Sequence, residues 1–184
     1  MAPRAGQAVR WNRRTDTSPQ EQHVTNAAPA DPALANLVAI EEIKRLKHRY
    51  LRCLDGKDWE PFSETLAPAI TAKYGKYTFD DRDALVAFMR KHMGRKEMLT
   101  EHFAAHPEVT VDGDTAHGYW HLSDTVLIPS QGVMLRGAAV YDDDYARGED
   151  GRWRITRTGY ERTYEYVVKL EDLPSFAVTA NKWA

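Results

Sequence analysis

The sequence is poor in cysteine, has no long hydrophobic run and carries no excess of basic residues. Its single cysteine, Cys53, cannot form a disulfide within one chain, and it excludes Cys₄ and Cys₂His₂ zinc sites. No apolar run reaches the roughly 20 residues that a membrane span needs, so no membrane partner is expected. The net charge of −2 does not favour binding to a nucleic-acid backbone, so no nucleic-acid partner is expected either.

The N-terminal segment also lacks hydrophobic periodicity. Residues 1–30 are rich in Ala, Pro, Thr, Gln and Arg, and such a segment buries too little apolar surface to offset the entropy of ordering it. We therefore predict a mobile tail over residues 1–30. Its arginines are followed by no apolar stretch of the kind found in secretory signals, so a cytoplasmic location is expected.

The apolar residues that the chain does contain are patterned first as helices. Hydrophobic residues make up 42% of the chain, and its length of 184 residues suits a single domain. Asp31-Pro32 is typical of a helix start, and apolar residues then recur at steps of three or four until Gly56. Two further helices are expected, each preceded by a capping aspartate: Asp58 for the second, and Asp80 or Asp81 for the third.

The rest of the chain alternates between apolar and polar residues, which indicates strands. A short strand or hairpin is predicted over 70–79, and four long strands follow it: 100–111, 115–128, 133–145 and 152–166. Strands of this length twist and coil strongly. We therefore predict an α+β domain over residues 31–168, in which a strongly curved antiparallel sheet forms a cone-shaped barrel around the long first helix. The open mouth of such a cone favours a polar-lined pocket.

Two polar side chains are candidates for acid–base chemistry in that pocket. His102 lies on the first long strand, and an inward-facing neutral imidazole would accept protons near pH 7. Asp55 lies near the C-terminus of the first helix, where the helix dipole disfavours a carboxylate without solvent or a cationic partner. A carboxylate on one imidazole nitrogen would fix the tautomer and stabilise the imidazolium. Tyr50 could donate to a leaving hydroxyl or a carbonyl, and Arg147 could hold developing negative charge.

Each candidate also has a structural interpretation. His102 could be a satisfied core histidine, Asp55 a turn residue, and Tyr50 part of the apolar stripe of the helix. Arg147 could pair with one of the carboxylates at 142–144. No Asp or Glu ligand pattern, P-loop or dinucleotide fingerprint is present, so neither a metal nor a cofactor is expected. Two same-face histidine pairs are the nearest approach to a metal site: His102 with His106, and His117 with His121.

Three groups of short motifs follow one another along the chain: Tyr50-x₄-Asp55-x₂-Asp58-Trp59-x₂-Phe62, then Thr100-x-His102 with Val111-Asp112-Gly113-Asp114-Thr115-Ala116, then Tyr141-x₃-Tyr145-x-Arg147 with Gly151-Arg152-Trp153-Arg154-Ile155. Over about residues 37–166 they resemble the SnoaL-like group of the nuclear transport factor 2-like superfamily. In pattern they are similar to its bile acid 7α-dehydratase, scytalone dehydratase and hexachlorocyclohexane dehydrochlorinase branches.

This resemblance implies a cofactor-free lyase or isomerase, dehydratase-like, that acts on a largely apolar cyclic small molecule of the polyketide or steroid kind. By position, Asp55 and His102 match the dyad that removes a proton in these branches. Tyr50 matches a tyrosine of the bile acid dehydratase and a lysine of the dehydrochlorinase. Arg147 matches the arginine before the last turn.

The remaining expectations concern the pocket wall and partners. His106 stands where the group often has Asn, so the specific substrate is left open. A small-molecule binding module without catalysis, or an oligomerisation module, is the alternative function. A homodimer or homotrimer is expected because a curved sheet exposes its outer face, and residues 169–184 are expected to close the pocket or an interface. Substrate contacts are expected from Trp59, Phe62, His106, Trp120 and Tyr160.

Overall fold

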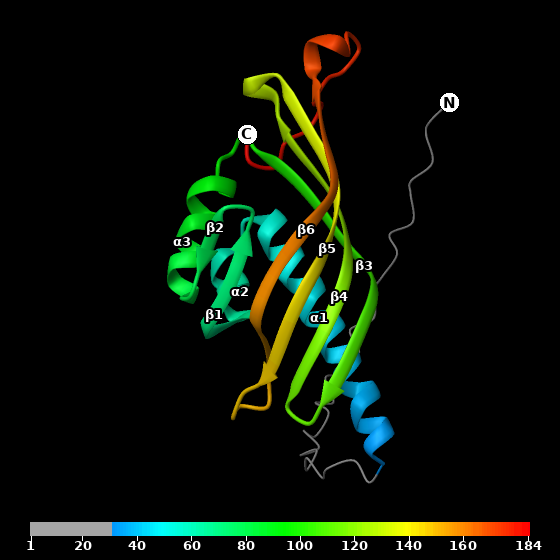
Figure 1. Cartoon of the computed structure of the whole chain (residues 1–184). Coiled ribbons are helices and arrows are strands. Elements are labelled where there is room, and N and C mark those ends of the chain that lie inside the picture. The colour runs from blue at the N-terminus through cyan, green and yellow to red at the C-terminus, as the bar shows by residue number, and fades with distance from the viewer. Residues whose placement is uncertain (1–30) are drawn as a thin grey trace, which may run out of the picture.

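The computed structural model describes residues 31–184, which form three helices, six strands and two short 3₁₀ turns (Figure 1). The predicted tail, residues 1–30, lies outside the described part of the chain. The helices are α1 (Pro32–Gly56), α2 (Trp59–Glu64) and α3 (Arg82–Met93). The strands are β1 (Leu66–Tyr74), β2 (Tyr77–Phe79), β3 (Leu99–Asp112), β4 (Thr115–Ile128), β5 (Val133–Arg147) and β6 (Trp153–Lys169). The 3₁₀ turns are η1 (Pro129–Gln131) and η2 (Leu170–Asp172).

All six strands belong to one sheet in the order β2-β1-β6-β5-β4-β3. The α+β prediction is confirmed, but the prediction of an antiparallel sheet is wrong at one pair, because β1 and β6 are parallel. β1 and β6 are the first and the last strand along the chain, and they are neighbours in the sheet. The chain between them provides the long crossover that parallel strands need. Within residues 31–184 the sheet is not closed by hydrogen bonds, so the predicted barrel is not confirmed.

Helix α1 packs along the concave side of the sheet, which curves around it (Figure 1). Its buried stripe includes Ile43, Leu46, Tyr50 and Leu54, at the spacing of one helix face. Every second residue is buried over 116–124 on β4 and 137–145 on β5, so one face of each strand points toward the helix and the other points outward. No helix of residues 31–184 has both the length and the apolar character that crossing a membrane requires.

Helix α1 ends at Gly56, as predicted, and the capping residue that follows it, Lys57, is in the left-handed conformation with φ of 58°. Its side chain is anchored, because Nζ donates to the carbonyl oxygens of Met93 at 2.6 Å and Met98 at 2.9 Å. These bonds tie the end of α1, and with it Asp55, to the segment that leads into β3.

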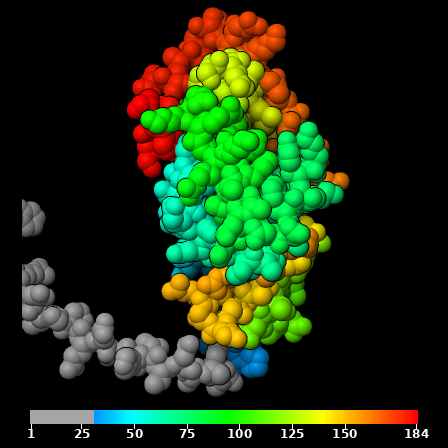
Figure 2. Space-filling model, turned by 90° about the vertical axis from the view of Figure 1, so that its left-hand side faces the viewer, coloured from blue at the N-terminus to red at the C-terminus, as the bar shows by residue number. Residues whose placement is uncertain are grey.

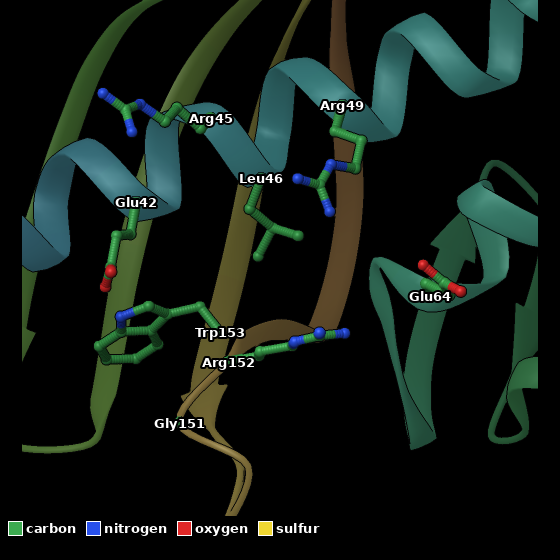
Figure 3. A pocket seen from close by; sticks show the side chains of 8 residues that line it. All are labelled: Glu42, Arg45, Leu46, Arg49, Glu64, Gly151, Arg152 and Trp153. Atoms are coloured by element: carbon green, nitrogen blue, oxygen red, sulfur yellow. The ribbon is translucent and has the colours of Figure 1, made fainter. Parts of the chain in front are cut away.

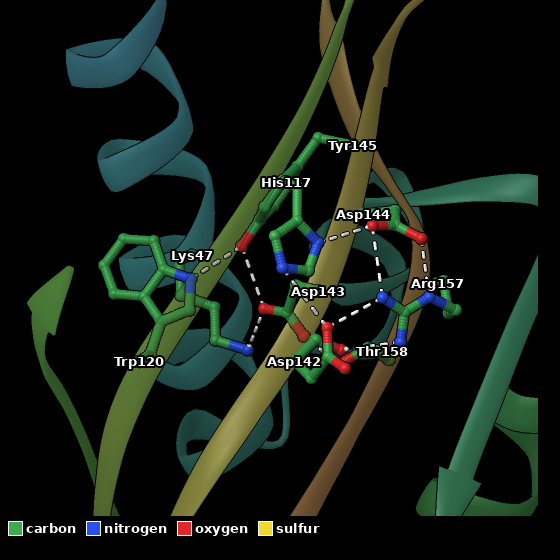
Figure 4. Close-up of polar contacts among 9 residues, drawn as sticks. All are labelled: Lys47, His117, Trp120, Asp142, Asp143, Asp144, Tyr145, Arg157 and Thr158. Atoms are coloured by element: carbon green, nitrogen blue, oxygen red, sulfur yellow. Dashed lines mark hydrogen bonds and ion pairs between the residues drawn. The ribbon is translucent and has the colours of Figure 1, made fainter. Parts of the chain in front are cut away.

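Three consecutive aspartates on β5 point to alternate faces of the sheet (Figure 4). Asp143 points inward, where its Oδ2 lies 2.6 Å from Nζ of Lys47 on α1, and both side chains are fully buried. Burial lowers the pKa of Lys47, and the Asp143 carboxylate opposes this shift. Asp142 and Asp144 point outward and both pair with Arg157. The alternation of the strand therefore gives one acidic run two separate roles.

The buried carboxylate of Asp143 is fully supplied with hydrogen-bond donors. Besides Lys47, it accepts from the Thr158 hydroxyl at 2.7 Å and from the Tyr145 hydroxyl at 2.8 Å. The indole N–H of Trp120 donates in turn to the Tyr145 oxygen at 2.8 Å (Figure 4). Trp120 is wholly buried and belongs to this network, and its predicted contact with a substrate stays a prediction.

The outer-face cluster predicts an acid-dependent contribution to stability. Arg157, foremost, and His117 hydrogen-bond to Asp144 and lower the pKa of its carboxyl. A carboxylate with a lowered folded-state pKa stabilises the fold above its unfolded pKa of about 4, and this contribution is lost as the pH falls below that value. We expect Asp144→Asn to lower the free energy of unfolding at pH 7 by less than about 1 kcal/mol, because the pair is partly exposed.

The measurement is urea denaturation of both proteins at pH 7 and pH 3. The difference between Asp144→Asn and the parent should shrink at pH 3. Asp80→Asn serves as the control, because Asp80 is exposed and has no ion pair among residues 31–184. A difference that grows on acidification would contradict the expected sign.

The segment after β6 returns to the end of the molecule that carries the C-terminus of α1. In Figure 2 this segment, in red, lies against residues at the start of β3, in green. The side-chain amide of Asn181 donates to the carbonyl oxygen of Lys96 at 3.2 Å, and Nζ of Lys57 lies 4.6 Å from the centroid of the Trp183 ring. That residues 169–184 close a pocket or an interface stays a prediction.

Candidate functional site

The structure brings Asp55 and His102 into direct contact. Oδ1 of Asp55 lies 2.6 Å from Nδ1 of His102, and Oδ2 accepts the backbone N–H of His102 at 2.9 Å. The hydroxyl of Thr100 donates to Oδ1 at 2.8 Å. The side chains of His102 and Asp55 are 8% and 22% exposed. One carboxylate is thus held by three groups on β3, at the end of α1 that Lys57 anchors.

This geometry prepares the imidazole for proton transfer. A carboxylate on Nδ1 favours the tautomer that carries its proton there, which leaves the lone pair on Nε2. Within the described chain, Nε2 of His102 makes no hydrogen bond. The nitrogen that can accept a proton is therefore free of protein partners among residues 31–184, while the other is fixed by Asp55.

A second charged pair lies beside the dyad, and it was not predicted. Asp124 on β4 is the direct cross-strand partner of His102, and its side chain is 3% exposed. Arg162 on β6 binds both carboxylate oxygens of Asp124, at 2.6 and 2.8 Å. The signal available in the sequence was a single acidic residue among the inward positions of β4, whose other members, Ala116, Gly118, Trp120 and Leu122, carry no charge. Arg162 could be placed only once the strand register was known.

A row of tyrosine side chains in contact with one another leads from Arg162 to Tyr50. The guanidinium of Arg162 lies 5.0 Å from the ring centroid of Tyr160, and the Tyr160 ring is 5.7 Å from that of Tyr74. The hydroxyl oxygens of Tyr74 and Tyr50 are 2.6 Å apart. Burial raises the pKa of Tyr50 well above its usual value, so this hydroxyl keeps its proton at neutral pH. Tyr160 and Arg162 also line a groove of about 1090 Å³ that follows β6.

The position of Arg147 corrects its predicted role beside the dyad. Arg147 is the last residue of β5, where its guanidinium lies 3.6 Å from Glu42 and 3.5 Å from Asp114. The row of the sheet that contains His102 crosses β5 at Gly137. Ten residues of strand separate Gly137 from Arg147, about 33 Å at 3.3 Å per residue. Arg147 therefore belongs to the opposite end of the sheet.

The position of His106 also corrects a prediction. Regular alternation would place it on the inner face with His102, but β3 has a bulge between Ala105 and Glu108, and His106 has φ of 50°. Its ring packs edge-on against His121 on the outer face, with centroids 5.5 Å apart. An extra residue in a strand shifts the alternation, so His106 cannot line a pocket shared with His102.

The remaining predicted contact residues lie on α2 and pack into the core. Phe62 is fully buried and its ring lies 5.0 Å from that of Tyr50. Trp59 is half-buried and packs edge-on against Phe62, at 6.1 Å between centroids. Both residues support the helix end that carries Asp55. Contact between either of them and a substrate stays a prediction.

The Thr100 hydroxyl offers a test of how the dyad is positioned. Thr100→Val keeps the shape of the side chain but removes the hydrogen bond to Asp55. A hydrogen bond to a charged group contributes about 1.5–3 kcal/mol, so we expect turnover to fall about tenfold or more. Thr100→Ser, which keeps the hydroxyl, should retain most of the activity. Equal turnover of the Val and Ser variants would contradict a positioning role.

Comparison with protein-family models confirms the resemblance that the motifs indicated. The model described as "SnoaL-like domain" matches residues 35–159, which is more than half of the chain and includes Asp55, His102 and Asp124. The protein therefore belongs to the SnoaL-like family.

Solved structures with the same fold include members of two enzyme branches. A candidate scytalone dehydratase from Novosphingobium aromaticivorans superposes with a TM-score of 0.65 at 17% identity, covering 79% of this chain and 92% of the other. A hexachlorocyclohexane dehydrochlorinase from Novosphingobium barchaimii gives a TM-score of 0.65 at 15% identity, covering 72% and 91%. A Mycobacterium tuberculosis protein of unknown function gives a TM-score of 0.64 at 23% identity, covering 80% and 82%. At these identities the likeness establishes the fold alone.

Proposed function

We propose that this protein is a lyase or isomerase of the dehydratase type, which acts without a cofactor on a largely apolar cyclic small molecule. The observation that carries the proposal is the contact of 2.6 Å between Asp55 Oδ1 and His102 Nδ1. The second Asp55 oxygen holds the backbone of the same histidine. The candidate scytalone dehydratase and the dehydrochlorinase among the fold neighbours support a reaction in which a proton and a leaving group depart together.

In the proposed reaction, Nε2 of His102 takes a proton from a carbon next to an activating group such as a carbonyl. The electron pair of that C–H bond forms a carbon–carbon double bond while the bond to a neighbouring hydroxyl breaks. The departing oxygen takes a proton and leaves as water. Asp55 stabilises the imidazolium that forms on His102, as a carboxylate on the other nitrogen does in catalytic triads.

Arg162 takes the role that the sequence suggested for Arg147. This assignment is supported by the bond of Arg162 to Asp124, which is the cross-strand neighbour of His102. Its guanidinium would stabilise negative charge that develops on a substrate oxygen, and Asp124 holds it in position. Tyr50, protonated and bonded to Tyr74, remains the proposed donor to the leaving hydroxyl or to a carbonyl.

The proposal is tested by incubating the protein with a panel of cyclic β-hydroxy ketones, including steroid and aromatic polyketide types. Dehydration of these compounds creates a conjugated enone, which absorbs in the ultraviolet and loses 18 mass units. Turnover of one panel member, abolished in His102→Ala, would support the lyase. A compound that binds and is recovered intact, without exchanging a carbon-bound proton in heavy water, would favour the alternative of a binding module.

A further inference from the structure

A hollow of about 500 Å³ lies between the middle of α1 and the start of β6 (Figure 3). It is bounded by α1 on one side and by Gly151, Arg152 and Trp153, at the start of β6, on the other. Leu46 and Trp153, both buried, form its apolar floor. The other side chains around it are charged: Glu42, Arg45, Arg49, Glu64 and Arg152.

The positive charges of this hollow are not neutralised by the residues described. Most arginines of residues 31–184 have a carboxylate oxygen within 4.0 Å, but Arg45, Arg49 and Arg152 have none in that part of the chain. Of the two carboxylates of the hollow, Glu42 is already partly balanced, because it lies 3.6 Å from Arg147. The surplus charge is therefore positive.

The floor of the hollow contains an unsatisfied donor. Trp153 is 6% exposed, and its indole Nε1 is buried with no acceptor among residues 31–184. Figure 3 shows this nitrogen on the edge of the ring that faces α1, below Glu42. Buried N–H groups in folded proteins nearly always have an acceptor, so an orphan donor next to unpaired guanidinium groups points to a ligand with acceptor oxygens.

The geometry points to a binding site for a small organic anion in this hollow, in which Arg49 and Arg152 hold the acidic group and Leu46 and Trp153 contact the apolar part. In Figure 3 Arg49 extends from α1 towards the segment that carries Arg152, whereas Arg45 points away. The volume exceeds that of an inorganic anion, and the floor is apolar, so the ligand class is a carboxylate, sulfate or phosphate ester with a flat hydrophobic body.

This site is separate from the proposed lyase site. Trp153 pairs with Arg147 at the end of β5, about 33 Å along the strand from the row that contains His102. Arg49 is six residues before Asp55 on α1, about 9 Å along the helix. Neither Asp55 nor His102 lines the hollow, so the inference stands whether or not the dyad is catalytic.

The experiment titrates the full chain with 1-naphthoate and follows the indole N–H resonances by ¹H–¹⁵N NMR, with the Trp153 signal assigned from Trp153→Phe. We expect a saturable shift of that signal. Affinity should fall about 10- to 100-fold in the double variant Arg49→Gln/Arg152→Gln, which loses charge-assisted hydrogen bonds. Arg136→Gln is the matched control, because Arg136 is also exposed and has no carboxylate partner among residues 31–184, but does not line the hollow.

Three results would overturn the proposal. The first is the absence of a saturable shift at Trp153. The second is equal affinity for the neutral analogue 1-naphthalenemethanol, or unchanged affinity in the double variant, since either would show that the arginines do not hold the acidic group. The third is a saturable shift confined to the indole signals of tryptophans other than Trp153. Melting temperatures of the variants show whether each is folded. If either Gln variant is unstable, the lysine variants Arg49→Lys and Arg152→Lys, which keep the charge, are used in its place.

Discussion

Replacing His102 with alanine is expected to lower turnover by about 10²–10⁴-fold, the usual contribution of a general base. Among residues 31–184, the imidazole of His102 is the one ring whose nitrogen contacts the Asp55 carboxylate, and its loss leaves Asp55 without that partner. The measurement is kcat and kcat/KM on the panel compound that the parent protein converts. The loss should appear in kcat, because proton abstraction is a transition-state interaction.

The matched control is His106→Ala, which removes a histidine from the same strand. His106 packs against His121 on the outer face, so its removal should leave kcat within about twofold, as expected of a surface substitution. Asp55→Asn keeps the shape of the side chain but loses its charge, and should lose activity together with His102→Ala. If His102→Ala turned over substrate at the parental rate, the proposed mechanism would be excluded.

Replacing Asp143 with alanine is expected to lower the free energy of unfolding by about 3–5 kcal/mol. Asp143 and Lys47 form a fully buried ion pair, so the substitution leaves an ammonium group without its counter-charge in the core. The same change removes the acceptor of Thr158 and Tyr145. Urea denaturation at pH 7 measures the loss, which is large compared with the usual 5–15 kcal/mol of total stability.

A double variant that removes both charges distinguishes the loss of the ion pair from the burial of one unpaired charge. Lys47→Met with Asp143→Leu replaces both groups by apolar side chains, and we expect it to be more stable than Asp143→Ala alone. Asp142→Ala is the control on the neighbouring position, since its side chain is about half exposed. If Asp143→Ala and Asp142→Ala destabilised the protein equally, the buried pair would not have the energetic weight argued for it.

The sequence pointed to Asp55 and His102 because both lie where local patterns are informative. A carboxylate near a helix C-terminus and a histidine in a long strand are visible without tertiary structure, and the family motifs linked them. Asp124 and Arg162 were missed because their relation to His102 depends on the register of four strands, β3 to β6. Their separation along the chain carries no information about that register.

The two misplaced residues have equally specific causes. His106 was assigned to the inner face by counting in twos from His102, and the bulge at His106 and Pro107 breaks that count. Arg147 was placed beside the dyad by motif position. Its strand runs from one end of the sheet to the other, and Arg147 stands at the end far from His102.

By itself the sequence determined the helix-then-sheet order, the ranges of the long strands and the amphipathic first helix, because these follow from periodicity and capping over neighbouring residues. It also determined the family, because the motif order is a property of the chain. Only the tertiary structure decided that the sheet is open and mixed, which face each histidine takes, and which arginine stands beside His102. Those features depend on strand register and pairing, which are set by packing between residues far apart in the chain.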